Sequence, residues 1–422
     1  MIKQLIYIVP IILLLIFSII LIFFRFTDIP GNLAFDEVEF AKLALSLDGK
    51  TYIPYSPLAT GHSTLYFYFI LLSFKIIGIN IFALRLPSAI FGILSIIVFY
   101  YIMKTVFKKL NILMPFLLAL VFLSSRWFFN FARFSFEATL LIFLELMSLY
   151  FLISWLNNPK GYIKLIFVGI FAGLAYNSYT PGRIFFLVPL FAIIYSFIHK
   201  SKNFRNFINL INYKTVISFI IPFIIIIAPL AVYLTQNPDN RFDKQFFLKN
   251  TEMKASEKIG YLISNISSTA LMFNFKGDLN GRHNYPGKSA LNPLMGLFFL
   301  AGFIIAIIKR NEIINRIFIF YFFIALLPAI LTYPWENPNM LRTVSVVPSV
   351  VYFIGLTITN LGSVKLKLIR ISKKIIFSLI VLLLISFCYE IRTYFLYQSN
   401  VFNEAFEIKQ DLKTALKNNY EK

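Results

Sequence analysis

Long apolar stretches recur from one end of the chain to the other, with short polar segments between them. Each stretch has roughly 15 to 25 residues, enough to approach or cross a hydrocarbon core of about 30 Å. The pattern predicts an all-α polytopic membrane protein of about eleven transmembrane helices, with no soluble domain of ordinary size. The expected spans are residues 5–24, 83–103, 111–127, 138–156, 162–179, 184–199, 215–235, 291–308, 316–333, 344–361 and 375–395.

Two apolar stretches need a separate decision. The first, residues 5–24, is too long for a secretory signal, and no Ala-x-Ala-like cleavage site precedes Arg25, so we expect a retained first helix. Residues 63–78 are apolar enough for a span, but counting them would invert the sidedness of every later loop. We therefore expect an interfacial helix there, within the first outer loop.

The charged residues give the chain a direction across the membrane. Of 422 residues, 59% are hydrophobic and 14% charged, and the formal net charge is +21. Alternate loops hold 18 of the 40 Lys and Arg and only one of the 19 Asp and Glu, which marks them as cytoplasmic. They lie around Lys3 and in residues 104–109, 160–164, 200–214, 309–316 and 365–374.

This placement predicts a multi-pass protein of the cell membrane with a cytoplasmic N-terminus. Membrane lipids with anionic headgroups are the natural counter-charge for the basic loops, so nucleic acid is excluded as a partner. The single cysteine, Cys388, excludes an internal disulfide and any site built from several cysteines.

The opposite face carries the longer loops, residues 25–82, 124–137 and 236–290. Without a repeat or a low-complexity linker, residues 1–397 are expected to form one transmembrane domain. Residues 398–422 are expected to be a short extracytoplasmic tail that forms an interfacial or mobile helix.

The first outer loop contains acids beside a helical apolar pattern. A carboxylate such as Asp36 can act as a general base that takes the proton of an acceptor hydroxyl. The spacing of Asp36 and Glu39 also fits an N-terminal capping box, in which side chains satisfy free helix amides. Both interpretations stay open at this stage.

Charged residues in two further outer turns have two interpretations each. Arg133 and Glu137 are four residues apart, so they fit either an ion pair on one helix or a functional pair at the membrane boundary. The turn at residues 176–183 contains Tyr179 and ends with Arg183, which either extends to lipid headgroups or binds a lipid phosphate.

Two more outer turns each add an arginine. Residues 277–287 are rich in turn formers and contain Arg282 and His283, and residues 333–343 contain Arg342. Several arginines on one face can hold a phosphate or pyrophosphate leaving group and stabilise its developing charge.

The histidines give weak evidence for a metal. His199 lies in a basic inner loop and is expected to be structural, whereas His62 and His283 lie on the outer side. Their spacing with the acids is not that of a known metal site, so a divalent metal is left open and no cofactor is assigned.

Taken together, these segments resemble the protein O-mannosyltransferase and lipid A aminoarabinose transferase superfamily. The resemblance covers most of the chain, in the order expected for that superfamily. It is carried by the acidic pair after the first helix, the interfacial helix, and residues 82–92 (FALRLPSAIFG), 131–137 (FARFSFE), 179–183 (YTPGR), 281–284 (GRHN) and 341–343 (LRT).

The resemblance implies a GT-C fold, a polyprenyl-phosphate sugar donor and inversion at the anomeric carbon. By position, Asp36 matches the family's catalytic acid, Glu37 its neighbour, and Glu137 an acid common in the second outer loop. Where the family often has Lys-Pro-Pro before the interfacial helix, this chain has Gly61-His62-Ser63, so His62 stands in for the phosphate-binding lysine.

The resulting hypothesis is a membrane glycosyltransferase that moves a sugar from a lipid-linked donor to a lipid, glycan or protein acceptor at the outer face. Asp36 and Glu37 are the expected catalytic acids. The residues expected to bind the donor phosphate or substrate are His62, Arg133, Glu137, Tyr179, Arg183, Arg282, His283 and Arg342.

The alternative is a transporter or flippase for lipid-linked sugars. Transporters usually place polar or broken-helix features near the middle of the membrane and often contain inverted repeats. Here Glu145 is the only acid well inside an expected span, and the sequence has no evident repeat.

Overall fold

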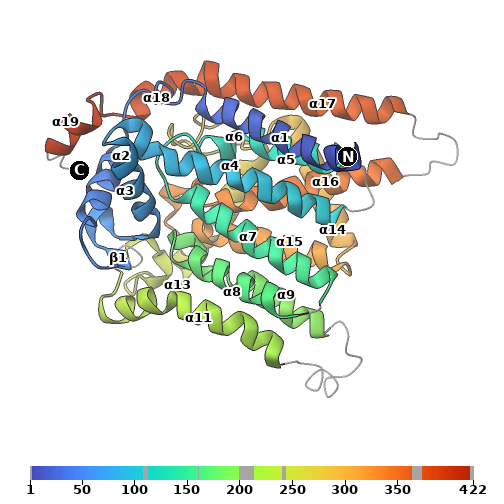
Figure 1. Ribbon diagram of the computed structural model, residues 1–422, viewed down its shortest axis with the longest axis horizontal. Helices are drawn as coiled ribbons and strands as arrows, with labels where there is room; N and C mark the ends of the chain where they lie inside the picture. Colours follow the sequence, from blue (N-terminus) through green and yellow to red (C-terminus); the bar gives the residue numbers. More distant parts are fainter. Residues whose placement is uncertain are drawn as a thin grey trace.

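The computed structural model describes residues 2–107, 113–159, 161–198, 213–239, 244–363 and 373–418. The long helices run side by side along the longest axis of the molecule (Figure 1). The loops expected to be cytoplasmic lie partly outside the described residues. The positions concerned are His199, Lys160 and the basic residues at 108–109, 200–212 and 364–372.

A helix occurs at each of the eleven expected spans. Seven helical stretches of the described chain are long and apolar enough to cross a membrane, and several others, including α5 and α8, are apolar but shorter. The all-α multi-pass architecture is therefore confirmed, while the number of spans stays a prediction. These helices are α1 (Ile2–Phe23), α4 (Ile81–Val106), α5 (Leu113–Ser124), α7 (Ala138–Asn157), α8 (Ile163–Tyr176), α9 (Leu187–Ile198), α11 (Tyr213–Gln236), α14 (Pro293–Ile308), α15 (Ile313–Ile330), α16 (Val347–Ser363) and α17 (Lys373–Arg392).

Small residues let neighbouring helices approach closely. A Cβ added at Gly169 of α8 would lie 2.3 Å from the carbonyl oxygen of Phe219 in α11. Gly302 of α14 likewise lies directly against the backbone of Phe353 in α16. Helices in lipid associate largely through such close backbone packing, so these glycines fix the two helix pairs.

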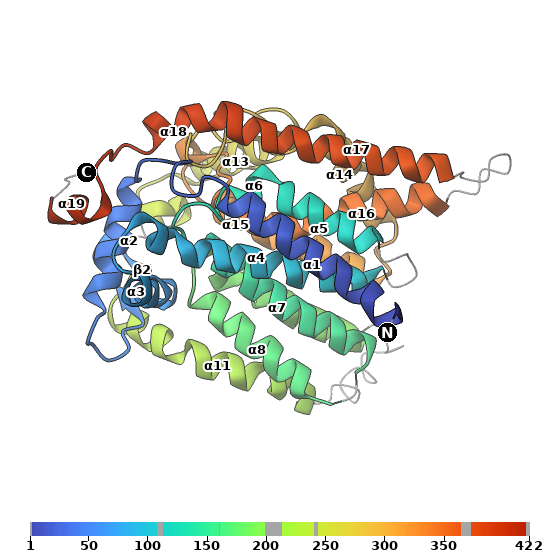
Figure 2. The same cartoon turned by 45° about the horizontal axis from the view of Figure 1, so that its top comes forward.

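The expected first outer loop, residues 25–82, folds into a small layer at one end of the bundle, which we call the α2 end (Figures 1 and 2). The expected interfacial helix is α3, whose 13 residues span about 20 Å and are too short to cross the membrane alone. The layer comprises α2 (Phe35–Ser46), the antiparallel strands β1 (Tyr55–Ser56) and β2 (His62–Ser63), the 3-10 turn η1 (Leu58–Thr60) and α3 (Leu65–Ile77).

The loop expected at residues 236–290 contains a 20-residue helix, α13 (Ala255–Asn274), that hydropathy does not reveal. Asn265 joins it to the end of α15 by donating to the carbonyls of Ile330 and Thr332. The other short elements are α6 (Arg126–Phe129) and the turns η2 (Thr180–Ile184), η3 (Phe247–Lys249), η4 (Pro334–Glu336) and η5 (Val344–Val346).

The C-terminal residues return to the α2 end as more than one helix. A π-helical turn, η6 (Thr393–Gln398), continues α17 into α18 (Ser399–Ala405), and α19 (Leu412–Lys417) follows. An isolated antiparallel bridge joins Ile408 to Leu33, just before α2. The expected short tail is therefore a pair of short helices attached to the first outer loop.

Candidate active site

Asp36 lies in the first turn of α2 and forms an ion pair with Arg282. Its Oδ2 accepts a hydrogen bond from Arg282 Nη1 at 2.7 Å, and the two side chains are 32% and 26% exposed. The capping-box interpretation of Asp36 and Glu39 is wrong, because α2 begins after Ala34 and Glu37, not Glu39, accepts from the amide of this N-cap residue. The partly exposed pair places a carboxylate where a substrate can reach it.

Glu37, the neighbour of Asp36, is buried and fully engaged. Its carboxylate accepts two bonds from the Arg85 guanidinium, both at 2.8 Å, one from the Ser135 amide at 2.9 Å and one from the Ala34 amide at 3.1 Å. Bidentate pairs of this kind fix geometry as well as charge. Glu37 thus joins α2 to α4 and to the segment before α7, an arrangement that suits a positioning residue.

Arg282 sits on a loop held by one buried acid. Asp278 accepts from the Asn280 amide at 2.8 Å, from His283 Nδ1 at 2.9 Å and from the Met340 amide at 2.8 Å. Asn130 donates to the Arg282 carbonyl at 2.8 Å. The loop is therefore rigid, and it presents Arg282 and His283 toward Asp36.

The space beside Asp36 is very small while this ion pair is formed. Its volume is about 10 Å³, roughly what one water molecule needs. While Arg282 pairs with Asp36, this cavity holds nothing larger than such a molecule. The cavity is lined by Ala34, Asp36, Glu37, Phe134, Ser135, Phe136, Arg282 and His283.

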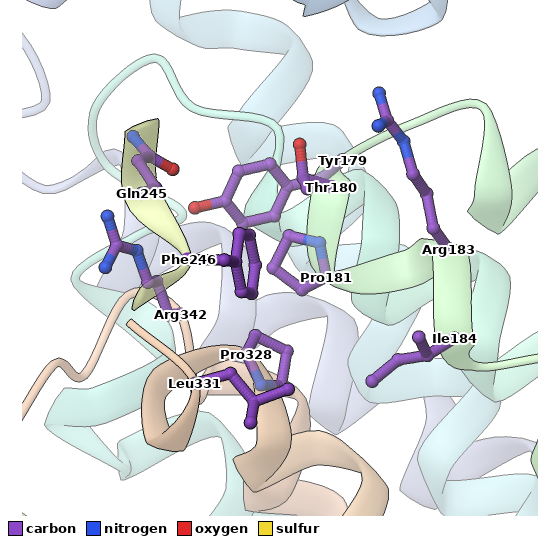
Figure 3. A pocket seen from close by; sticks show the side chains of 10 residues that line it. All are labelled: Tyr179, Thr180, Pro181, Arg183, Ile184, Gln245, Phe246, Pro328, Leu331 and Arg342. Carbon is purple, nitrogen blue, oxygen red and sulfur yellow. The ribbon is translucent and has the colours of Figure 1, made fainter. Parts of the chain in front are cut away.

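A second, larger pocket lies between two arginines (Figure 3). Its volume is about 110 Å³, and its lining is mostly apolar. Figure 3 shows Arg342 and Arg183 on opposite sides, with Phe246 between them and Leu331 below. The lining residues are Tyr179, Thr180, Pro181, Arg183, Ile184, Gln245, Phe246, Pro328, Leu331 and Arg342.

Each of these arginines pairs with an acid of the described chain. Arg183 Nη1 donates to Asp239 Oδ2 at 3.1 Å, and Tyr55 donates to the other oxygen of Asp239 at 2.9 Å. Arg342 pairs with Glu336. The buried Nε of Arg183 has no hydrogen-bond partner among the described residues.

One aromatic contact separates the two cavities. The ring of Tyr179, in the wall of the larger pocket, meets the ring of Phe136, in the wall of the Asp36 cavity, edge-on at 5.6 Å. The bond from Met340 to Asp278 brings the segment with Arg342 to the Arg282 loop. Asp36, Arg183, Arg282 and Arg342 therefore lie at the same end of the bundle, in the walls of two neighbouring cavities.

Arg133 lines neither cavity and binds the end of α1 instead. Its guanidinium donates to the carbonyls at the end of α1, including that of Leu21 at 2.9 Å and that of Phe24 at 2.7 Å, and to the Tyr394 hydroxyl at 3.2 Å. Burial lowers the pKa of the Arg133 guanidinium. The end of α1 favours a positive charge beside it, because the last carbonyls of a helix carry partial negative charge. All of its donors are occupied, so phosphate binding by Arg133 does not fit this arrangement.

Glu137 does not pair with Arg133, because the residues before α7 form turns rather than a helix. Its Oε1 lies 2.6 Å from His62 Nδ1, and both side chains are buried. The rings of Phe40 and Phe67 pack edge-on against the His62 ring. Neither His62 nor Glu137 lines the two cavities, so the expected contact of His62 with the donor phosphate is not part of this geometry.

The described residues contain no group of three or more His, Cys, Asp or Glu side chains placed to share a metal ion. His62 and His283 each face one carboxylate, Glu137 and Asp278 respectively.

Sequence analysis missed Arg85 and Asp278 as parts of the site. Arg85 carries a charge at the start of an expected span, where an ionisable residue is by default a candidate functional residue with a partner. That signal was present in the sequence. Asp278 gave no such signal, because it lies in a loop rich in turn formers.

The sequence matches one protein family over part of its length. Residues 61–226 match the family described as dolichyl-phosphate-mannose-protein mannosyltransferase. A search of curated proteins gave no significant match.

Solved structures of two membrane enzymes share the fold. The oligosaccharyltransferase AglB from Archaeoglobus fulgidus, in complex with an inhibitory peptide and a dolichol-phosphate, is 15% identical with a TM-score of 0.56, and the match covers 96% of this chain. ArnT from Cupriavidus metallidurans in the apo state is 11% identical with a TM-score of 0.55, again over 96% of this chain. A second ArnT structure, bound to undecaprenyl phosphate, gives 0.53. This chain spans 56% of the AglB chain and 76% of the apo ArnT chain.

Proposed function

We propose that this chain, a glycosyltransferase of the GT-C superfamily, moves a sugar from a polyprenyl-phosphate carrier to an acceptor hydroxyl, with inversion at the anomeric carbon. The observation that carries the proposal is the juxtaposition of a partly exposed carboxylate, Asp36, with an apolar pocket flanked by Arg183 and Arg342. A lipid-linked phosphate fits such a pocket, because its polyprenyl tail needs apolar surface and its phosphate headgroup needs cations.

In the proposed reaction the acceptor oxygen attacks the anomeric carbon of the donor. The bond between that carbon and the phosphate oxygen breaks, and polyprenyl phosphate leaves with the electron pair. Asp36 takes the proton of the acceptor hydroxyl as the new bond forms. Arg183 and Arg342 stabilise the negative charge that develops on the leaving phosphate.

The Asp36–Arg282 pair gives Arg282 a defined part in this scheme. Arg282 bonds one carboxylate oxygen, Oδ2, and so orients the carboxylate that takes the proton. His283 lines the same cavity and is oriented by Asp278, so it is placed to contact the acceptor.

Two properties of the relatives support the donor class. One ArnT structure holds undecaprenyl phosphate, and AglB is in complex with dolichol-phosphate. The distribution of basic loops supports an extracytoplasmic site in the cell membrane with a cytoplasmic N-terminus. The proposed acceptor is a lipid, a glycan or a protein of the cell envelope, and residues 1–397 with the returning C-terminus form one catalytic unit.

The test is a transfer assay with purified full-length protein in proteoliposomes and a panel of polyprenyl-phosphate sugars. We expect a glycosylated product and one released polyprenyl phosphate for each sugar transferred. A flippase would move intact donor and release none. Movement of donor without release of polyprenyl phosphate would therefore overturn the proposal.

The variant Asp36→Asn tests the base. General acid–base groups typically contribute about 10²- to 10⁴-fold, so we expect turnover to fall by about that factor while the protein stays folded. Asp28→Asn, the same change at an exposed position of the same outer loop, is the matched control and should transfer sugar normally. Normal turnover by folded Asp36→Asn would remove Asp36 from this role.

A further inference from the structure

The C-terminal segment, residues 399–418, contacts the chain directly before Asp36. The Leu33 amide donates to the Ile408 carbonyl at 2.9 Å, and the Ile408 amide donates back at 3.0 Å. Beside this bridge, Glu407 Oε1 accepts from the Phe35 amide at 3.1 Å.

The bond from Phe35 engages an amide in the first turn of α2, where amides have no acceptor within the helix. The N-cap residue, Ala34, has no side-chain oxygen to offer, and Glu37 bonds the Ala34 amide rather than that of Phe35. Free amides and the helix dipole favour a carboxylate at this position. Glu407 supplies it from a segment more than 370 positions later in the chain.

The same segment also touches the loop that carries Arg282. A Cβ at Gly281 would lie 2.7 Å from Val401 and 3.0 Å from Ala405, so only glycine lets this loop rest against α18. The backbone before Asp36 and the loop that carries Arg282 therefore both contact the C-terminal segment.

Further contacts fix the C-terminal segment in place. Phe406 is fully buried and meets Phe134, in the wall of the Asp36 cavity, edge-on at 5.5 Å. The Arg85 guanidinium, which binds Glu37, lies 5.9 Å from the Phe406 ring. On α19, Leu412 and Ala415 are buried, and this helix packs against α2.

We propose that the C-terminal segment is part of the framework of the active site and that Glu407 is a positioning residue for Asp36. Glu407 lines neither cavity, so it acts through the backbone of α2 rather than on a substrate. By holding the Phe35 amide it sets where the Asp36 carboxylate lies relative to Arg282. This inference rests on the proposed role of Asp36 as the base.

The experiment compares three variants of the full-length chain in the transfer assay. Misplacement of a reacting group by about 1 Å can cost about 10²-fold, so we expect Glu407→Ala to lower kcat by about tenfold and leave the KM for the donor unchanged. Glu407→Gln keeps an oxygen that accepts the same hydrogen bond and should restore most of kcat. Glu404→Ala removes the same charge from an exposed position of α18 and should behave as the unaltered protein.

Hydrogen exchange of the amides in residues 34–38 gives a readout that needs no activity. Glu407→Ala should speed exchange of the Phe35 amide, and Glu404→Ala should not. Faster exchange with unchanged kcat would overturn the positioning role, and unchanged exchange would overturn the contact. If the unaltered protein protects the Phe35 amide from exchange but transfers no sugar, both the proposed function and the positioning role are overturned. The hydrogen bond between Phe35 and Glu407 then stays established.

Discussion

Asp36 and Glu37 are adjacent acids whose surroundings give them different tasks. Glu37 is 1% exposed and bound on every side, whereas Asp36 is partly exposed, pairs with Arg282 and borders a cavity. Removing one partner of a buried ion pair typically costs about 3–5 kcal/mol, because the other charge stays buried and unpaired. Sequence position alone made both residues candidates for catalysis, and only the environment separates them.

Arg342 gives a prediction at this scale. It flanks the larger pocket, so Arg342→Ala should weaken binding of polyprenyl phosphate by at least about tenfold, the loss expected for one charge-assisted bond of about 1.5–3 kcal/mol. Binding is measured by titration calorimetry in detergent, without any need for turnover. Arg310→Ala, an exposed arginine of the turn between α14 and α15, serves as control. Equal affinity in both variants would rule out Arg342 as a phosphate ligand.

The role of a residue was easier to predict when its interaction partners lie close to it along the sequence. Asp36, Arg183 and Arg342 became candidates because a charge in a loop between apolar stretches is visible in the local sequence. Arg133 and Glu137 were misjudged because their true partners, the end of α1 and His62, lie 75 or more positions away. A local four-residue spacing carries no information on such contacts.

At the scale of elements, hydropathy located the long helices but missed α13. The exposed face of α13 carries Ile259, Ile263 and Ile266, while Asn265 and Thr269 are buried against the protein. Because polar residues, among them Asn265 and Thr269, interrupt the apolar ones along this helix, the mean hydropathy stays below that of a span. Such a helix is expected to lie in the membrane interface with that face toward lipid.

This placement of α13 can be measured with spin labels. With Cys388 replaced by serine, a nitroxide at Ile263→Cys should collide more with oxygen, which concentrates in lipid, than with a water-soluble nickel complex. A nitroxide at Ser256→Cys, in the exposed first turn of the same helix, should show the opposite preference. Equal accessibility to the nickel complex at both positions would place α13 in water.

At the scale of the whole molecule, the sequence predicted the architecture well, because hydropathy and the distribution of charge act on every helix. It could not predict that the C-terminal residues support the first outer loop, since the bridge between Leu33 and Ile408 is formed by backbone groups with no side-chain signature. The polar composition of the C-terminal residues was typical of a solvated tail.

The sidedness of the bundle yields a prediction for the intact membrane. In a Cys388→Ser background, Lys50→Cys lies beyond α2 and Arg310→Cys lies in the turn after α14, and both positions are exposed. A membrane-impermeant maleimide should label Lys50→Cys in intact cells and Arg310→Cys only after permeabilisation. The reverse pattern would place Asp36 and the pocket arginines in the cytoplasm.

The contacts of Arg133 also bear on the order in which the protein is completed during its synthesis. The carbonyls at the end of α1 emerge from the ribosome more than 100 residues before the guanidinium that satisfies them, and Tyr394 follows 261 residues after Arg133. The end of α1 thus acquires these donors only after α4 and α5 have been synthesised. A nascent chain interrupted before Arg133 leaves those carbonyls without the donors that bind them in the complete fold.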